Sequence, residues 1–170
     1  LIWVPVAGAL VIVALPRDKK DVIKWVAASF TGLQLILAVV LWMNFDKDFV
    51  GFQFMEKAAW IPSFNITYML GVDGLSLPMV VLTALLSFLC VFVSWNIDKA
   101  LKGYFSLFLL LDAGMMGVFV SLDFFLFYVF WEVMLLPMYF LIGIWGGPQR
   151  EYAAIKFFLY TLFGSVLMLI

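Results

Sequence analysis

The sequence predicts an all-α fold, a polytopic bundle of transmembrane helices. Hydrophobic residues make up 66% of the 170 residues, whereas a soluble domain contains about 45–50%. Only 12% of the residues are charged, roughly half of the share in a typical soluble domain. The hydrophobic residues also form runs of about 20, the length that an α-helix needs to cross a bilayer. These three observations exclude a soluble globular domain and a disordered chain.

The composition also excludes several kinds of function. The net charge of −1 gives no basic surface for binding nucleic acid, so we expect no nucleic-acid partner. The chain has no histidine and a single cysteine, Cys90, which disfavours a zinc site or a ligated haem. We therefore expect no metal and no cofactor bound by this chain.

Polar residues divide the chain into six apolar segments, which we expect to be helices of one transmembrane domain. The first segment would be only about 22 Å long, too short for a hydrocarbon core of about 30 Å. The chain starts and stops inside apolar runs, so we expect a piece of a longer membrane protein. The expected helices cover residues 1–15, 22–43, 74–95, 104–121, 123–145 and 151–170, and an outer loop covers residues 45–73.

Basic residues concentrate in alternate loops, which predicts the orientation of the chain. By the positive-inside rule these loops are cytoplasmic, so the N-terminus lies outside. The basic residues of the three loops are Arg17, Lys19, Lys20 and Lys24, then Lys99 and Lys102, then Arg150.

The outer loop contains two local signals. Val50, Phe52 and Phe54 alternate with other residues at a period of two, which predicts a short strand or hairpin on the outer surface. Asp73 or Ser76 can cap the start of the next helix.

Two acidic residues, Asp112 and Glu132, lie deep inside predicted helices, where an ionisable side chain is costly. They lie ten residues on either side of Leu122, the centre of the short turn between their helices. An antiparallel helical hairpin would therefore place them at equal depth. The helical rise from Asp123 to Glu132 is about 13.5 Å, close to half the thickness of the hydrocarbon core. Both carboxyl groups are therefore expected near the membrane midplane. The spacing leaves open whether the two carboxyl groups face each other, and whether each carries protons or is a structural group.

The neighbours of Glu132 favour a role in proton transfer. Tyr128 and Tyr139 share its helix face, because they lie four residues before and seven residues after it. Pro137 has no N–H, so the carbonyl of Val133 loses its helical partner and can bind water.

Two further charged residues each have two interpretations. Asp123 either caps the fifth helix or takes part in the proton path. Lys156 either extends to the cytoplasmic face or enters a polar pathway in the sixth helix.

Three blocks of the sequence resemble one family, the antiporter-like subunit M of respiratory complex I, called chain 4 in mitochondria and plastids. The blocks are WIPSFNITYMLGVDGLSLPMVVLT (residues 60–83), SLDFFLFYVFWEVMLLPMYFLIGIWGG (121–147) and REYAAIKFFLYTLFGSVLMLI (150–170). Subunits L and N and the Mrp-type cation/proton antiporters share the general pattern. The WIPSF and VDGLSLP blocks favour subunit M among them.

The resemblance implies an antiporter-like subunit fold, of which this chain covers about the first five to six helices. It implies a proton-translocating subunit in the membrane arm of an NADH:quinone oxidoreductase. In the family the glutamate of the fifth helix is essential to the proton path, and Glu132 occupies that position. Asp123 matches an aspartate that is also implicated. The charge partner of the glutamate is a lysine of the seventh helix, so Lys156 is not that partner, and Asp112 receives no role from the resemblance.

The same resemblance implies the setting of the protein. NADH, FMN, iron–sulfur clusters and quinone would be bound by other subunits, and no redox chemistry is expected in this chain. Its partners would be other membrane-arm subunits, including related antiporter-like ones, and membrane lipids. The expected location is the bacterial inner membrane with the N-terminus on the periplasmic side. Two alternatives stay open: a subunit of an Mrp-type Na⁺/H⁺ antiporter, or a structural membrane subunit whose buried carboxylates only hold helices together.

Overall fold

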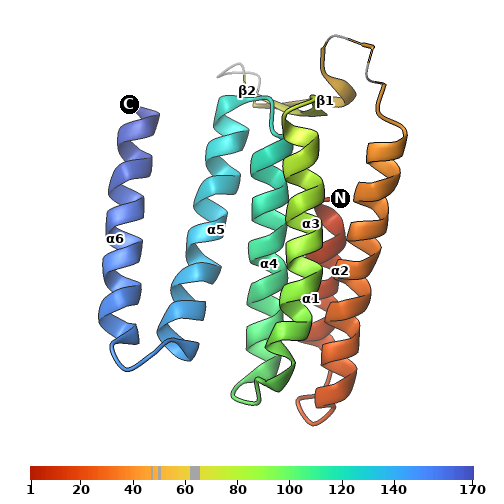
Figure 1. Ribbon diagram of the computed structural model, residues 1–170. Helices are drawn as coiled ribbons and strands as arrows, with labels where there is room; N and C mark the ends of the chain where they lie inside the picture. Colours follow the sequence, from red (N-terminus) through yellow and green to blue (C-terminus); the bar gives the residue numbers. More distant parts are fainter. Residues whose placement is uncertain (47, 50, 62–65) are drawn as a thin grey trace.

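The computed structural model describes residues 1–170 except residues 47, 50 and 62–65. The described residues form six α-helices, one 3-10 turn and one antiparallel hairpin (Figure 1). In chain order they are α1 (Trp3–Ala14), α2 (Lys20–Met43), β1 (Gln53–Ile61), β2 (Ile66–Val72), α3 (Ser76–Val93), η2 (Ser94–Asn96), α4 (Leu101–Val120), α5 (Phe124–Trp145) and α6 (Arg150–Leu169).

The fold class predicted from the sequence is confirmed. Five helices, α2 to α6, are long and apolar enough to cross a membrane, whereas α1 has only 12 residues. Helix α2 begins at Lys20, two residues before the expected start, and α4 begins at Leu101 instead of residue 104. The chain is an integral membrane protein with a small hairpin added to its helices.

Helices α1 to α4 pack around one another, while α5 and α6 extend the bundle sideways (Figure 1). One cluster of buried side chains joins α1, α2, α3 and α4 and includes Ile12, Ile23 and Phe105. Helix α5 lies against α4, and α6 lies against α5 at the edge of the described structure. Consequently α5 is the element that connects the α1–α4 bundle to α6.

The three basic loops lie at one end of the bundle, and the hairpin lies at the other end (Figure 1). Contacts between these loops hold the basic end together. Lys20 Nζ lies 3.5 Å from Asp98 Oδ1, and Lys102 Nζ donates to the carbonyl oxygen of Leu15 at 2.8 Å. The basic loops that alternate along the sequence thus gather at one end of the folded chain.

The outer loop contains the expected hairpin, although at a different position. The alternating pattern predicted a strand from Val50, but β1 begins at Gln53 and pairs with β2, with Gln53 opposite Val72. Residue 50 and residues 62–65, which include part of the WIPSF block, lie outside the described residues.

Helix α3 begins with a reciprocal cap formed by Asp73 and Ser76. Asp73 Oδ1 accepts hydrogen bonds from the backbone N–H groups of Leu75 at 3.1 Å and Ser76 at 2.6 Å. The Ser76 hydroxyl oxygen in turn accepts from the Asp73 N–H at 3.0 Å. These bonds, above all the one from the Ser76 N–H, lower the pKa of the Asp73 carboxyl. Of the two capping residues expected, Asp73 caps the helix and Ser76 supports it.

The close packing of α4 on α5 depends on Gly117, and we predict that Gly117→Ala destabilises the protein. A Cβ atom at this position would lie 2.3 Å from the ring of Phe130, so the two helices would have to separate. We expect the free energy of unfolding to fall by about 1–3 kcal/mol. The measurement is denaturant unfolding of the full-length protein in detergent.

Gly74→Ala is the matched control for this prediction, because a Cβ atom at Gly74 would meet nothing within 4 Å. An equal loss of stability in the two variants would contradict the role of Gly117.

Candidate functional site

Glu132 lies near the middle of α5 and turns towards α6. The hydroxyl of Ser165, on α6, donates a hydrogen bond to Glu132 Oε1. The hydroxyl of Tyr128, one turn earlier on α5, lies beside both of these groups. Ser165 is only 4% exposed, and Glu132 and Tyr128 are partly buried. The α5–α6 interface therefore brings a carboxyl group and two hydroxyl groups together.

The contact between α4 and α5 determines this orientation of Glu132. Gly114 and Gly117 of α4 lie against Met134 and Phe130 of α5, where a Cβ atom would come within 2.5 Å and 2.3 Å of their side chains. Phe130 and Met134 share one helix face, because they are four residues apart. Glu132 is two residues from each, which rotates it by about 200° from that face. The side chain is thereby directed away from α4.

Tyr139 and Pro137 lie further along α5, as the sequence indicated. The ring of Tyr139 packs against Phe158 of α6 with 5.6 Å between centroids, so Tyr139 lies in the same interface as Glu132. Helix α5 continues through Pro137, which is buried. Because proline has no N–H, the carbonyl of Val133 lacks its usual helical donor one residue from Glu132.

Asp112 occupies a separate place inside the α1–α4 bundle. It is fully buried, and its Oδ1 accepts a hydrogen bond from the Ser87 hydroxyl of α3 at 2.6 Å. The side chain of Gln34, on α2, lies beside the carboxyl group. Asp112 is two residues from Gly114, so it too is rotated away from the α4–α5 contact. The question left open by the spacing is thus answered: the two carboxyl groups do not face each other.

The depths of the two carboxyl groups are nevertheless similar. A Cβ atom at Gly114 would lie 3.4 Å from the Phe130 carbonyl and 3.5 Å from the Met134 nitrogen, on either side of Glu132. Gly114 is therefore level with Glu132, and Asp112 lies two residues away, about 3 Å along the helix.

Asp123 caps α5 and joins it to the hairpin. Its Oδ1 accepts from the N–H groups of Phe125 at 2.9 Å and Leu126 at 3.2 Å. Its Oδ2 accepts from the N–H of Thr67 at 3.1 Å and from the Thr67 hydroxyl at 3.2 Å. Desolvation by burial acts to raise the pKa of Asp123, but these hydrogen bonds together outweigh it and lower the pKa.

Lys156 does not share the Glu132 site. It is exposed on α6, and its ammonium group lies 5.6 Å from the ring centre of Tyr152. Lys156 and Ser165 are nine residues apart, which places them on opposite faces of α6. The structure therefore separates this lysine from the carboxyl group that Ser165 contacts.

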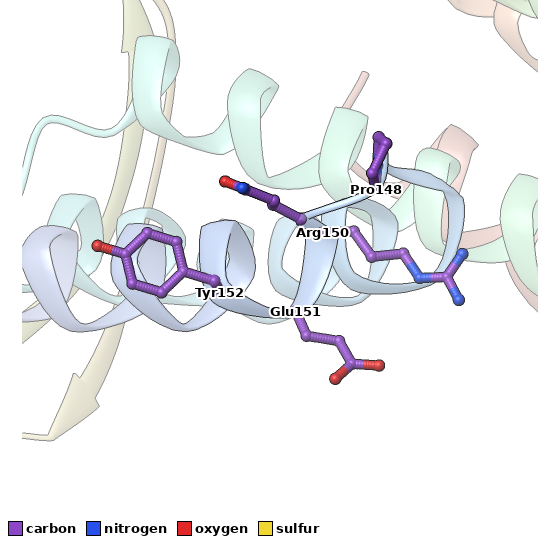
Figure 2. A pocket seen from close by; sticks show the side chains of 6 residues that line it. Pro148, Arg150, Glu151 and Tyr152 are labelled. Carbon is purple, nitrogen blue, oxygen red and sulfur yellow. The ribbon is translucent and has the colours of Figure 1, made fainter.

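A hollow lies at the turn between α5 and α6, and Figure 2 shows the side chains that line it. Its lining consists of the six consecutive residues from Gly147 to Tyr152. This hollow lies at the basic end of the bundle, at the opposite end of α5 from Asp123 (Figure 1). It belongs to the turn and forms no part of the Glu132 site.

Sequence reasoning missed three residues that the structure places beside the carboxyl groups: Ser165, Ser87 and Gln34. Each is a polar residue inside an apolar helix, which was a usable signal. The sequence could not show which carboxyl group each of these residues contacts, because that carboxyl group lies on another helix.

The chemistry available at Glu132 is proton exchange. A carboxyl group can bind and release a proton, and the hydroxyl groups of Ser165 and Tyr128 can donate to its ionised form or accept from its neutral form. Within the described residues, no group of three or more His, Cys, Asp or Glu side chains is placed to hold a metal ion.

The chain is similar in sequence to subunits of NADH-quinone oxidoreductases. Residues 121–170 match the family model described as NADH:quinone oxidoreductase/Mrp antiporter, TM. NADH-quinone oxidoreductase subunit M of Rhodobacter capsulatus is 44% identical over 99% of this chain and 33% of the relative. NADH-ubiquinone oxidoreductase chain 4 of Arabidopsis thaliana is 40% identical over 100% of this chain and 35% of the relative. The chain thus spans about a third of the length of the curated relatives it matches.

Solved structures share the fold. A chain of respiratory complex I from Thermus thermophilus with bound NADH superimposes with a TM-score of 0.83 and 29% identity, over 99% of this chain and 33% of that chain. A chain of the Mrp complex from a Dietzia species gives a TM-score of 0.76 at 22% identity, over 99% of this chain and 18% of that chain. The second likeness concerns the fold alone.

The cap formed by Asp123 leads to a prediction about pH. We expect Asp123→Ala to lower the free energy of unfolding at pH 7 by at least about 1 kcal/mol, because α5 loses its cap and the hairpin loses its anchor. The folded-state pKa of Asp123 is below its ordinary value of 3.8, so this stabilisation is present above pH 3.8 and is lost as the pH falls through the lowered pKa. Unfolding of the full-length protein in detergent at pH 7 and below pH 3 measures the difference.

Asp123→Asn serves as the control, because an asparagine oxygen still accepts the capping hydrogen bonds. If the difference between wild type and Asp123→Ala stayed constant down to the lowest pH, the ionised cap would have no role.

Proposed function

Since the chain is a homologue of subunit M (chain 4) of NADH-quinone oxidoreductases along its whole length, we propose that it forms part of a proton-translocating subunit of such an enzyme. This subunit would lie in the membrane arm of the enzyme. It would pump protons, driven by NADH oxidation and quinone reduction in other subunits. The observation that carries the proposal is the carboxyl group of Glu132, held inside the α5–α6 interface by Ser165.

Glu132 is the proposed proton carrier. A carboxyl group within a membrane helix is costly, and such groups mark ion and proton paths. In the described part of the chain the one ion pair within 4 Å joins Lys20 to Asp98, so Glu132 has no cationic partner there. A cation that approached Glu132 from another part of the protein would favour proton release, and its withdrawal would favour proton uptake. A lysine of a later helix, as the family resemblance implies, would supply that cation.

The other three charged residues, Asp123, Lys156 and Asp112, have different proposed roles. Asp123 holds the hairpin end of α5 through its hydrogen bonds to Phe125 and Thr67, and its proposed role is to pass protons into or out of that end of the helix. Lys156 would join a path only at the basic end of α6, beside Tyr152. Asp112 has its own partners inside the α1–α4 bundle and is a separate proposal.

The setting of the subunit is part of the proposal. The protein would lie in a bacterial inner membrane with its N-terminus on the periplasmic side, because the three basic loops share one end of the bundle (Figure 1). Other membrane-arm subunits, including related antiporter-like ones, and membrane lipids would surround it. NADH, FMN, iron–sulfur clusters and quinone would be held by other subunits of the enzyme.

A subunit of an Mrp-type Na⁺/H⁺ antiporter is the second candidate function. The matching family model includes these antiporters, and the Mrp complex shares the fold. An assembly of this kind would contain no redox subunits. Membranes that contain the native assembly would then show no NADH oxidation dependent on this protein.

We predict that Glu132→Gln abolishes coupled activity without dissociating the enzyme. Glutamine keeps the size of the side chain and an oxygen that accepts from Ser165, but it cannot carry a proton. In vesicles that contain the full-length subunit in its native complex, we expect NADH oxidation and the pH gradient both to fall to background. Native gel electrophoresis checks the assembly of the complex.

Glu151→Gln is the matched control, because Glu151 is exposed in the first turn of α6 and contacts neither Ser165 nor Tyr128. Normal pumping by Glu132→Gln would refute the proposed carrier. Loss of assembly in Glu132→Gln, with wild-type activity in whatever complex remained, would favour a structural subunit.

A further prediction concerns Ser165 as a positioning residue. Its hydroxyl donates to Glu132 Oε1, so Ser165→Ala removes the hydrogen bond that holds this carboxyl group in the α5–α6 interface. We expect Ser165→Ala to lower the coupled activity of the assembled complex in the same vesicles, and Ser165→Thr to restore it because threonine keeps the hydroxyl. An equal loss of activity in Ser165→Ala and Ser165→Thr would show that Ser165 only supports packing.

A further inference from the structure

The core of the α1–α4 bundle contains three polar side chains from three different helices. Asp112 of α4 and Gln34 of α2 are both 0% exposed, and Ser87 of α3 is 3% exposed. The Ser87 hydroxyl donates to Asp112 Oδ1 at 2.6 Å. The Gln34 side chain lies against the same carboxyl group. All three side chains of this Asp112 cluster lie within candidate membrane-spanning helices.

Three polar atoms of the Asp112 cluster have no hydrogen-bond partner among the described residues. They are Oδ2 of Asp112 and both side-chain atoms of Gln34, Oε1 and Nε2. A buried donor or acceptor left without a partner costs about 1–3 kcal/mol, so native structures rarely keep one. These unpartnered atoms belong to two side chains that lie next to each other, so each side chain can supply what the other lacks.

The ionisation state of Asp112 determines whether the two side chains can pair fully. An ionised carboxylate only accepts, so it would leave Gln34 Oε1 without a donor. A neutral carboxyl group has one O–H donor. Since Ser87 already donates to Oδ1, the proton belongs on Oδ2, where it can serve Gln34 Oε1, while Gln34 Nε2 can donate to the same carboxyl group.

In the described helices around α4, no charged group offers Asp112 a counter-ion. The cation of α4 itself, Lys102, is ten residues from Asp112 and donates to the carbonyl of Leu15. Helix α1 contains no ionisable residue, and α3 contains only Cys90. The cations of α2 lie near its start, and Lys24 is ten residues, about 15 Å, from Gln34, with its ammonium over the ring of Trp95. Helix α5 offers Glu132, which has the same charge as Asp112 and is turned towards α6. An unpaired charge in such a place costs far more than a neutral, hydrogen-bonded group.

We propose that the Asp112 cluster is a second proton-binding site, in which the neutral Asp112 carboxyl group accepts from Ser87 and donates to Gln34. Its ligand is a proton that exchanges with water. The site is independent of Glu132, because the α4–α5 contact at Gly114 and Gly117 separates the two carboxyl groups. The proposal therefore stands whether or not Glu132 carries protons during turnover.

Infrared spectroscopy of the full-length subunit in its native complex, reconstituted into lipid, tests the proposal directly. A neutral carboxyl group has a carbonyl stretching band that a carboxylate lacks. We expect Asp112→Asn to remove one such band from the spectrum of the wild type at pH 7. The same band should move to lower frequency in D₂O, because the carboxyl proton exchanges.

A variant of the partner Ser87, with a matched control, gives the band a second test that does not change Asp112 itself. Ser87→Ala removes the hydrogen bond to the carbonyl oxygen, so the band should move to higher frequency. Thr31→Val is the matched control, because Thr31 is equally buried on α2 but its hydroxyl donates within its own helix, to Ala27. Glu132→Gln should leave the band unchanged.

Each result decides the question. Spectra of wild type and Asp112→Asn that coincide, with both complexes assembled, would show that Asp112 is ionised and would overturn the proposal. A band that is lost in Asp112→Asn but never shifts in D₂O would show a permanently neutral structural group, which also overturns it. If Asp112→Asn fails to assemble, the shift in Ser87→Ala decides, and an unchanged band there refutes the site.

Discussion

Helices α4 and α5 approach each other closely, and this contact sets the direction of the charged side chains on both helices. Gly114 and Gly117 bring the two helices together, because any side chain at these positions would collide with Met134 or Phe130. The contact fixes the rotation of both helices about their axes. It follows that Glu132 is directed to one side of the α4–α5 pair and that polar residues of α4 are directed to the other.

The membrane environment explains why the intramembrane carboxyl groups have hydroxyl partners. Hydrocarbon offers no hydrogen bonds, so a polar group in a membrane helix must find its partner within the protein. Ser165 serves Glu132 across the α5–α6 interface, and Ser87 serves Asp112 across the α3–α4 interface. A serine adds little volume and supplies both a donor and an acceptor, which suits a carboxyl group that changes its protonation state.

The hairpin end of the molecule couples surface structure to the start of α5. Asp123 accepts hydrogen bonds from its own helix and from Thr67 of β2, so one carboxylate holds both elements. The N–H of Leu122 also donates to the carbonyl of Met69 at 2.9 Å. A displacement of the hairpin would therefore move the first turn of α5, the helix that carries Glu132.

The helices, the basic end of the bundle and the neighbours of each carboxyl group along its own helix could all be predicted from the sequence. Apolar runs predicted the helices, and Tyr139 was correctly expected to share a face with Glu132, because helical periodicity fixes angles within one helix. The packing of the helices was needed to show that Asp112 and Glu132 point apart, and that Gln34 and Ser165 lie beside them. The rotation of one helix against another depends on how side chains of both pack together, and no periodicity within a single helix contains that information.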